Sequence, residues 1–169
     1  MLLTRLLPLL YLLSLSSAAV SQDRPRIPAA PNTCSVTKPA NQHFVPPPPY
    51  PAKRSRGEFW FGTDRLWTAL PVNGTWSGLP HYTPDDPTFR QKLFFWRQGY
   101  DPHTERSKLT VTGRRIDSPS QPLLSDKTSD GSWKETLIVR GINFPTVGCW
   151  EITGHYGSDE VTFVVWVTE

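Results

Sequence analysis

The chain has 169 residues, which is long enough for one domain with a tail and too short for a multidomain enzyme. Hydrophobic residues make up 37% of it, a share that is low for a globular chain but too high for a fully disordered one. Its 2 Cys and 1 Met exclude a disulfide-rich scaffold and a cysteine metal cage. The 18 Lys and Arg against 15 Asp and Glu give a net charge of +3, whose meaning depends on where the charges lie.

Residues 1–21 have the pattern of a secretory signal peptide. Arg5 is their only charge, and the apolar run 6–15 is too short to span a bilayer comfortably. Small residues follow, so we expect cleavage after Ala19 or Ser21; a retained N-terminal anchor is the alternative. No later stretch is long and apolar enough for a transmembrane helix. We therefore expect a soluble, monomeric mature protein that is secreted or periplasmic.

Export determines how the two cysteines are interpreted. Cys34 and Cys149 would lie in an oxidising compartment, which favours one disulfide between them. Such a bond closes a loop of over a hundred residues. The chain-entropy model gives a loop of that length about 4–5 kcal/mol of stabilisation. Two free thiols, one of them reactive, are the alternative.

Residues 22–56 form a basic, proline-rich leader. They hold nine prolines, including the run Pro46–Pro49, and six Lys and Arg against one Asp, a net charge of +5. Proline fixes φ and removes a donor, so the leader should be extended and act as a semi-rigid spacer. Residues 57–169 carry 11 Lys and Arg and 14 Asp and Glu, a net charge of −3.

The position of the basic residues argues against binding of nucleic acid. A nucleic-acid surface needs cations and aromatic rings on one folded face, whereas the densest cluster here, 53–56, lies in the leader. This cluster could contact anionic envelope surfaces by salt-sensitive attraction. A solvated linker kept extended by its charges is the interpretation we favour.

From Gly57 onward the pattern is all-β. Short runs bounded by Gly, Pro or Asp, some with alternating polarity, predict strands over 58–61, 66–70, 93–97, 108–114, 136–142, 148–154 and 161–168. The last two are expected to form a hairpin through Gly157-Ser158-Asp159, and the segments 71–87, 99–106 and 117–132 are expected to be loops. About seven short strands predict a single antiparallel immunoglobulin-like β-sandwich over 57–169, with a small β-barrel as the alternative.

Three patches of sequence carry a family resemblance. They are the leader segment Cys-Ser-Val-Thr-Lys-Pro at 34–39, the stretch 109–117, and Phe-Pro-Thr-Val-Gly-Cys-Trp-Glu-Ile-Thr-Gly at 144–154. Together with Leu66-Trp67 and Phe95-Trp96-Arg97 they resemble a group of secreted bacterial proteins without an assigned activity. The resemblance covers most of the mature chain, and its last patch is the most specific. It implies an export signal, a pair of cysteines and a β-sandwich.

No motif in the chain predicts catalysis, a metal or a cofactor. The acidic clusters 85–86, 126 with 130, and 159–160 lie in expected loops or turns, where solvated side chains are the usual case. A glycosidase would need two such carboxylates at a fixed separation. The nucleophile motif Gly-x-Ser-x-Gly does not occur. The four His are scattered, and His81 with the nearby Asp pair offers too few donors for a divalent ion.

Aromatic residues exceed what one inward face per strand requires, and Phe94-Phe95-Trp96 places them on both faces of one strand. Exposed Trp near Arg could bind a sugar ring or a peptide edge by stacking and hydrogen bonds. Candidate contacts of this kind are Trp67, Trp96, Arg97 and Arg114. The alternative is that Pro46–Tyr50 lies across the rings. Asn73-Gly74-Thr75 matches a glycosylation sequon, but a simple turn is expected there.

These patterns together indicate an exported, non-catalytic binding or accessory module of the cell envelope. It would contact an envelope protein or glycan through an aromatic–arginine surface, without nucleic acid. A purely structural protein made of spacer and domain is one alternative. A secreted hydrolase that uses loop carboxylates is the other.

Overall fold

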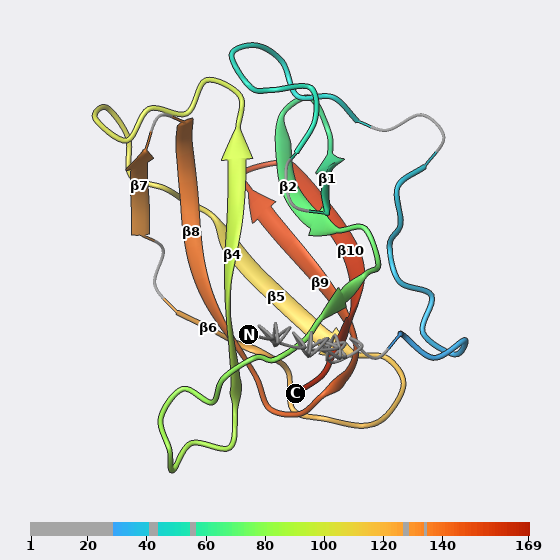
Figure 1. Ribbon diagram of the computed structural model, residues 1–169. Coiled ribbons are helices and arrows are strands. Elements are labelled where there is room, and N and C mark those ends of the chain that lie inside the picture. Colours follow the sequence, from blue (N-terminus) through green and yellow to red (C-terminus); the bar gives the residue numbers. More distant parts are fainter. Residues whose placement is uncertain (1–28, 41–43, 55–56, 127–128, 134) are drawn as a thin grey trace, which may run out of the picture.

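Every regular element that the computed structural model places is a β-strand (Figure 1). The structure describes residues 29–40, 44–54, 57–126, 129–133 and 135–169, so the predicted signal peptide lies outside the described residues. The ten strands are β1 Glu58–Gly62, β2 Leu66–Pro71, β3 Thr75–Trp76, β4 Phe89–Arg97, β5 Thr110–Arg115, β6 Leu124–Ser125, β7 Ser129–Trp133, β8 Glu135–Phe144, β9 Gly148–Tyr156 and β10 Asp159–Val167.

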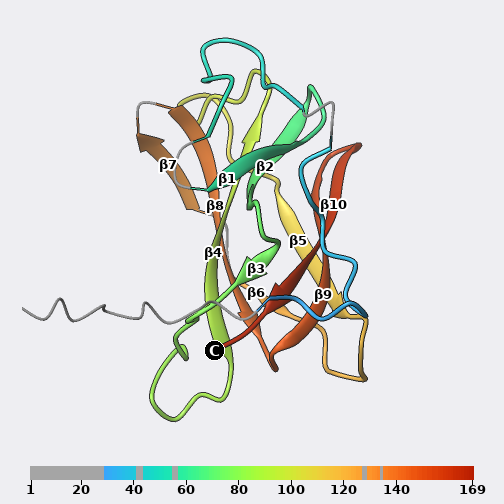
Figure 2. The same ribbon diagram turned by 45° about the vertical axis from the view of Figure 1, so that its right-hand side comes forward.

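The strands form two sheets that face each other as a β-sandwich (Figures 1 and 2). The first sheet has the order β1-β2-β4-β8-β6, with β7 also paired to β8, and the second has the order β3-β10-β9-β5. All pairs are antiparallel except β3 with β10. The predicted all-β class and the predicted terminal hairpin, in which Asp159 pairs with Tyr156, are confirmed.

Three strands lie where the sequence predicts loops. β3 and β6 have 2 residues each, which is too short for an alternating pattern to be visible. The sequence of β7, Ser-Asp-Gly-Ser-Trp, consists mostly of residues that favour turns, yet it pairs with β8 from Ser129↔Val139 onward. The prediction of loops over 71–87 and 117–132 was therefore wrong at these points, because pairing with a long neighbouring strand outweighs local preference.

Alternation of side chains builds the main core between the sheets. On β10 the odd-numbered residues, such as Phe163, point inward, and on β9 the even-numbered ones, such as Trp150 and Ile152, meet them. Gly154 continues this face of β9 without a side chain, and a Cβ there would collide with the ring of Phe95. The core therefore depends on a glycine at one of its inward positions.

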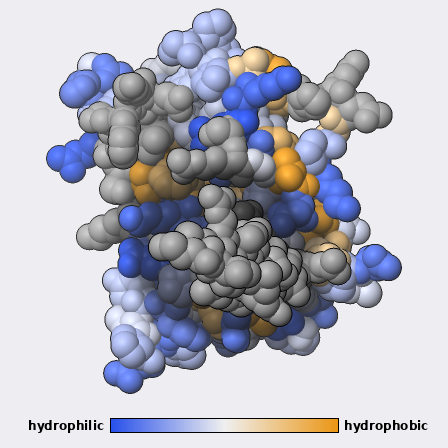
Figure 3. Space-filling model, viewed as in Figure 1, coloured by the Kyte–Doolittle hydropathy of each residue, from blue (hydrophilic) through white to orange (hydrophobic). Residues whose placement is uncertain are grey.

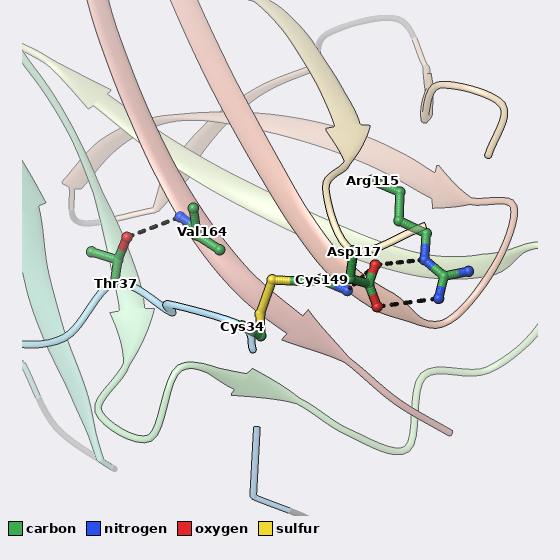
Figure 4. The surroundings of a disulfide bond; sticks show 6 residues. All are labelled: Cys34, Thr37, Arg115, Asp117, Cys149 and Val164. Carbon is green, nitrogen blue, oxygen red and sulfur yellow. Dashed lines mark hydrogen bonds and ion pairs between the residues drawn. A yellow bond between two sulfur atoms is a disulfide. The ribbon is translucent and has the colours of Figure 1, made fainter. Parts of the chain in front are cut away.

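The leader is fixed to the second sheet by the predicted disulfide, which is confirmed (Figure 4). Cys34 bonds to Cys149 on β9, with 5.6 Å between the two Cα atoms. Three residues later, the Thr37 N–H donates to the Val164 carbonyl at 2.9 Å, and the Val164 N–H donates to Thr37 Oγ1 at 2.9 Å. The leader thus satisfies backbone groups at the open edge of β10 as well as the cysteine on β9.

A carboxylate supports the strand beside the disulfide (Figure 4). Asp117 accepts hydrogen bonds from Arg115 Nε at 2.7 Å and from the Cys149 N–H at 3.1 Å. The hydrogen bond from the Arg115 side chain, followed by that from Cys149, holds the pKa of Asp117 below its usual value of 3.8. Hydrogen bonding to the charged form thus links the end of β5 to the start of β9.

Gly74 provides a test of how closely the leader packs on the domain. Gly74 and Gly78 both have positive φ, at 70° and 66°, but a Cβ on Gly74 would collide with Val36, whereas one on Gly78 would meet nothing within 4 Å. We expect Gly78→Ala to cost about 1–2 kcal/mol for the left-handed backbone. Gly74→Ala should cost about 1–3 kcal/mol more, because it also overpacks Val36. Urea unfolding of both variants measures the difference in unfolding free energy. Equal losses of free energy would show that Val36 does not pack against the turn at Gly74.

Candidate functional site

A second hydrophobic cluster, separate from the main core, lies on the outer face of the first sheet. It consists of Trp60, Trp67 and Trp96. Trp67 and Trp96 are register partners on β2 and β4, while Trp60 stands on β1 opposite Ala69. Strand alternation explains the placement, because Phe59 and Phe61 of β1 turn toward the main core and leave Trp60 on the other face. We call these three residues the tryptophan cluster.

Residues 44–54 of the leader, here called the strap, cover the tryptophan cluster. The rings of Phe44 and Tyr50 lie 5.9 and 5.2 Å from the ring of Trp67, centroid to centroid. Trp60 Nε1 donates a hydrogen bond of 2.8 Å to the Pro51 carbonyl. As a result Trp67 is 0% exposed and Trp96 is 2% exposed. The alternative in which the leader lies across the surplus rings is therefore correct, with the contacts made on both sides of the proline run.

Arg54 is the arginine that meets the tryptophan cluster. Its guanidinium carbon lies 4.7 Å from the ring centroid of Trp60 and 5.4 Å from that of Trp96. Its Nη2 also pairs with Glu58 Oε2 at 3.0 Å. A cation over the faces of two indole rings is attracted by their quadrupoles, so Arg54 holds the end of the strap against the sheet.

Two buried donors of the cluster are left without an acceptor. The indole Nε1 atoms of Trp67 and Trp96 make no hydrogen bond within the part of the chain that the structure describes. A buried donor without a partner costs about 1–3 kcal/mol, and such groups are rare in native proteins. The tryptophan cluster therefore has unused hydrogen-bonding capacity directly beneath the strap.

Two hollows flank the strap beside β1. One, of about 200 Å³, is lined by residues that include Pro39, Lys53, Arg54 and Glu58. The other, of about 170 Å³, is lined by residues that include Lys38, Ala40 and Gly62. Phe44, Phe59 and Trp60 line both. Both hollows thus combine aromatic walls with basic side chains.

The four contact candidates from the sequence do not come together on one exposed surface. Arg97 lies 4.5 Å from the ring centroid of Tyr156 and within 4 Å of the carboxylates of Glu105 and Asp159. Arg114 is 71% exposed and pairs with Glu151 at 2.8 Å on the outer face of the second sheet. The expected exposed surface of Trp67, Trp96, Arg97 and Arg114 was wrong in this respect, because the strap buries both tryptophans.

Burial also affects the surroundings of Arg97. Tyr156 is the last residue of β9, and its side chain is buried. Its ring contacts that of Tyr100 in the loop that follows β4. Burial raises the pKa of the Tyr156 phenol, and the nearby Glu105 carboxylate raises it further. Arg97 thus takes part in a network that joins β4 to the terminal hairpin.

Two of the three acidic clusters that the hydrolase alternative requires, 85–86 and 159–160, have members engaged in local contacts, while the side chain of residue 130 in the third lies outside the described ones. Asp159 pairs with Arg65 at 2.8 Å, and Glu160 lies 3.1 Å from His155 Nδ1. Asp86 accepts a hydrogen bond from the Thr88 N–H. Hydrogen bonding by Thr88, first through its side chain and then through this N–H, lowers the pKa of Asp86. Within the described ranges, no three His, Cys, Asp or Glu side chains group as a metal would require. Nor do these ranges contain a helix long and apolar enough to cross a membrane.

The comparisons with known proteins give no relative from which a function could be inferred, so the proposed function rests on the geometry of the site. No family model, curated protein or solved structure matches the chain. The resemblance to secreted bacterial proteins stays a prediction, which rests on the three sequence patches together with Leu66-Trp67 and Phe95-Trp96-Arg97. Sequence reasoning missed Arg54 and Phe44 as members of the site, whereas Tyr50 belongs to the segment 46–50 that one alternative placed across the rings. Their only sequence signal was a basic cluster next to a proline run, and nothing there shows which sheet face the run covers.

Proposed function

We propose that the protein is an exported, non-catalytic binding module of the cell envelope, built on an immunoglobulin-like sandwich. Its binding surface would be the tryptophan cluster with Arg54 and the adjoining hollows. The observation that carries this proposal is the pair of buried indole donors, on Trp67 and Trp96, that lack an acceptor beneath the strap. The disulfide supports export, because such bonds persist in oxidising compartments.

The chemistry of the surface suits a ligand with acceptor oxygens and a flat face. Sugar hydroxyls and peptide carbonyls both accept from indole N–H groups, as the Pro51 carbonyl does from Trp60. Aromatic faces add stacking, and Arg54 adds a cation beside them. The ligand would therefore be an envelope glycan or an envelope protein segment that engages the strap region.

An array of defined oligosaccharides and peptides tests the proposal. We expect Arg54→Ala to weaken binding of any captured probe about tenfold, since a cation–π contact that is partly desolvated is worth about 1–2 kcal/mol. Arg114→Ala is the matched control, because it removes an exposed arginine from the other sheet. Absence of any bound probe, or equal binding by both variants, would contradict the proposal.

Complete burial of Trp67 favours a second candidate, a purely structural protein in which the strap serves only to stabilise the sheet. In that case the array would remain empty for the unmodified chain. Arg54→Ala would still lower the free energy of unfolding, because the guanidinium packs on two rings. Stability and binding measured on the same variant therefore separate the two candidates.

A further inference from the structure

The outer edge of the first sheet is open at β1. β1 is the end strand of this sheet and pairs only with β2. The Val72 N–H donates to the Gly57 carbonyl, and the Thr63 N–H donates to the Leu66 carbonyl. Hydrogen-bonded pairs alternate along an antiparallel ladder. The N–H and C=O groups of the even-numbered residues Glu58, Trp60 and Gly62 consequently point away from β2.

These outward backbone groups have no backbone partner within the described part of the chain. In Figure 1, β1 closes the first sheet on the side along which the leader runs. An open edge is a template for pairing with another extended chain, and proteins usually cover or charge it. The leader does pair with the edge of β10 through Thr37, whereas the edge of β1 has no such backbone partner among the described residues.

Two hollows adjoin this edge, and together we call them the groove. The first hollow reaches the strand at Glu58 and the second at Gly62, and both include Trp60. Phe44 of the strap lines both hollows, as do Phe59 and Trp60. On the face drawn in Figure 3, hydrophobic residues among the described part of the chain reach the surface in separate areas between hydrophilic ones.

The walls of the groove are basic. Lys38 lines one hollow, and Lys53 and Arg54 line the other. Glu58 pairs with Arg54, whereas neither lysine makes a salt bridge among the described residues. The groove therefore presents two positive charges without a counter-charge, one in each hollow.

We propose that an extended acidic peptide segment of a partner protein binds in this groove as an additional strand on β1. The peptide backbone would pair with Trp60 and its even-numbered neighbours, alternate side chains would enter the two hollows, and acidic residues would meet Lys38 and Lys53. This inference rests on the proposed binding function and specifies its ligand class and its contact strand.

The positive charge of the groove favours an acidic peptide over a second copy of the chain as its occupant. Pairing of β1 with β1 of another copy would bring the lysines of both grooves toward one another, and like charges across an interface disfavour association. An acidic segment instead complements both lysines. β1 has 5 residues, which extend for roughly 17 Å at about 3.4 Å per residue, so an eight-residue peptide covers the edge.

Amide hydrogen exchange tests the backbone pairing. The probes are eight-residue peptides that alternate Glu or Asp with an apolar residue, added to the exported chain. We expect exchange of the Trp60 and Gly62 amides to slow at least tenfold at saturation. The Phe59 and Phe61 amides serve as internal controls, because they already point to β2 and should keep their rates. Loss of this alternation would show that the peptide docks elsewhere and would overturn the proposal.

Modified probes and charge variants test the same idea without relying on a single mutant. N-methylation of the peptide on the alternate residues that face β1 should weaken binding about tenfold or more, whereas methylation of the other set should not. Lys38→Glu and Lys53→Glu should each weaken binding severalfold. Lys92→Glu is the matched control, since Lys92 is an exposed residue of β4 that pairs with Gly141 rather than with β1.

The outcomes distinguish this inference from the proposed function. If oligosaccharides bind in an Arg54-dependent manner and no peptide does, strand addition is overturned while the binding module stands. If neither class of probe binds, both fail. If the chain associates with itself and thereby protects the Trp60 and Gly62 amides without peptide, a second copy is the occupant and the acidic peptide is overturned.

Discussion

Loss of the Cys34–Cys149 disulfide is expected to lower the free energy of unfolding by about 4–5 kcal/mol. The two cysteines are 115 residues apart in sequence, so the bond closes almost the whole of the described chain into one loop. In the chain-entropy model a cross-link of this span removes much of the freedom of the unfolded state. For a domain of this size the melting temperature should fall by about 20 °C.

Thermal unfolding with and without reductant measures this effect. Cys34→Ala/Cys149→Ala should match the reduced protein and should no longer respond to reductant, which controls for other actions of the thiol reagent. Alanine is preferred to serine because both positions are buried and a hydroxyl there would need a partner. A melting temperature that is the same in both redox states would show that the leader contributes nothing through this bond.

The hydrogen bonds around the disulfide limit how far its loss spreads. Thr37 is bonded to Val164 twice, and Asp117 binds the Cys149 N–H. These contacts do not depend on the sulfur atoms. We therefore expect the reduced protein to retain the second sheet and to unfold at lower temperature in one cooperative step.

Sequence reasoning succeeded where side-chain alternation is strong. The strand around Val111 carries a clear period of two, and Trp150 and Ile152 share one parity on theirs; the inward faces of both strands belong to the core. The disulfide followed from compartment and cysteine count alone. The missed strand β7 shows the limit of this reasoning, since Ser129–Trp133 becomes a strand only because β8 provides a partner along its length.

The candidate site was harder to predict because it depends on contacts between distant segments. Alternation correctly puts Trp60 on the face opposite Phe59, but it does not say that a proline-rich leader returns to cover that face. The cation beside the rings is Arg54, which is near Trp60 in sequence, rather than Arg97, which follows Trp96 directly. A neighbour in sequence on a strand points to the opposite face, and this rule would have excluded Arg97.

Trp67→Ala is expected to cost about 3–5 kcal/mol, because it truncates a fully buried aromatic side chain. The loss should extend to the strap, since the rings of Phe44 and Tyr50 both pack on Trp67. Limited trypsin digestion under native conditions measures how tightly the strap is held, because trypsin cleaves after Lys53 and Arg54 in the strap. We expect faster cleavage in the strap for Trp67→Ala than for the unmodified protein.

Trp67→Phe is the control that separates the ring from its donor. It keeps an aromatic ring under Phe44 and Tyr50 but removes the indole N–H that has no acceptor. Removing an unsatisfied donor offsets part of the lost packing, so the cost should be clearly smaller than that of alanine. If Trp67→Ala left both stability and the cleavage rate unchanged, the strap would not be packed on the sheet, and Trp67 would be available to a ligand without displacement of the strap.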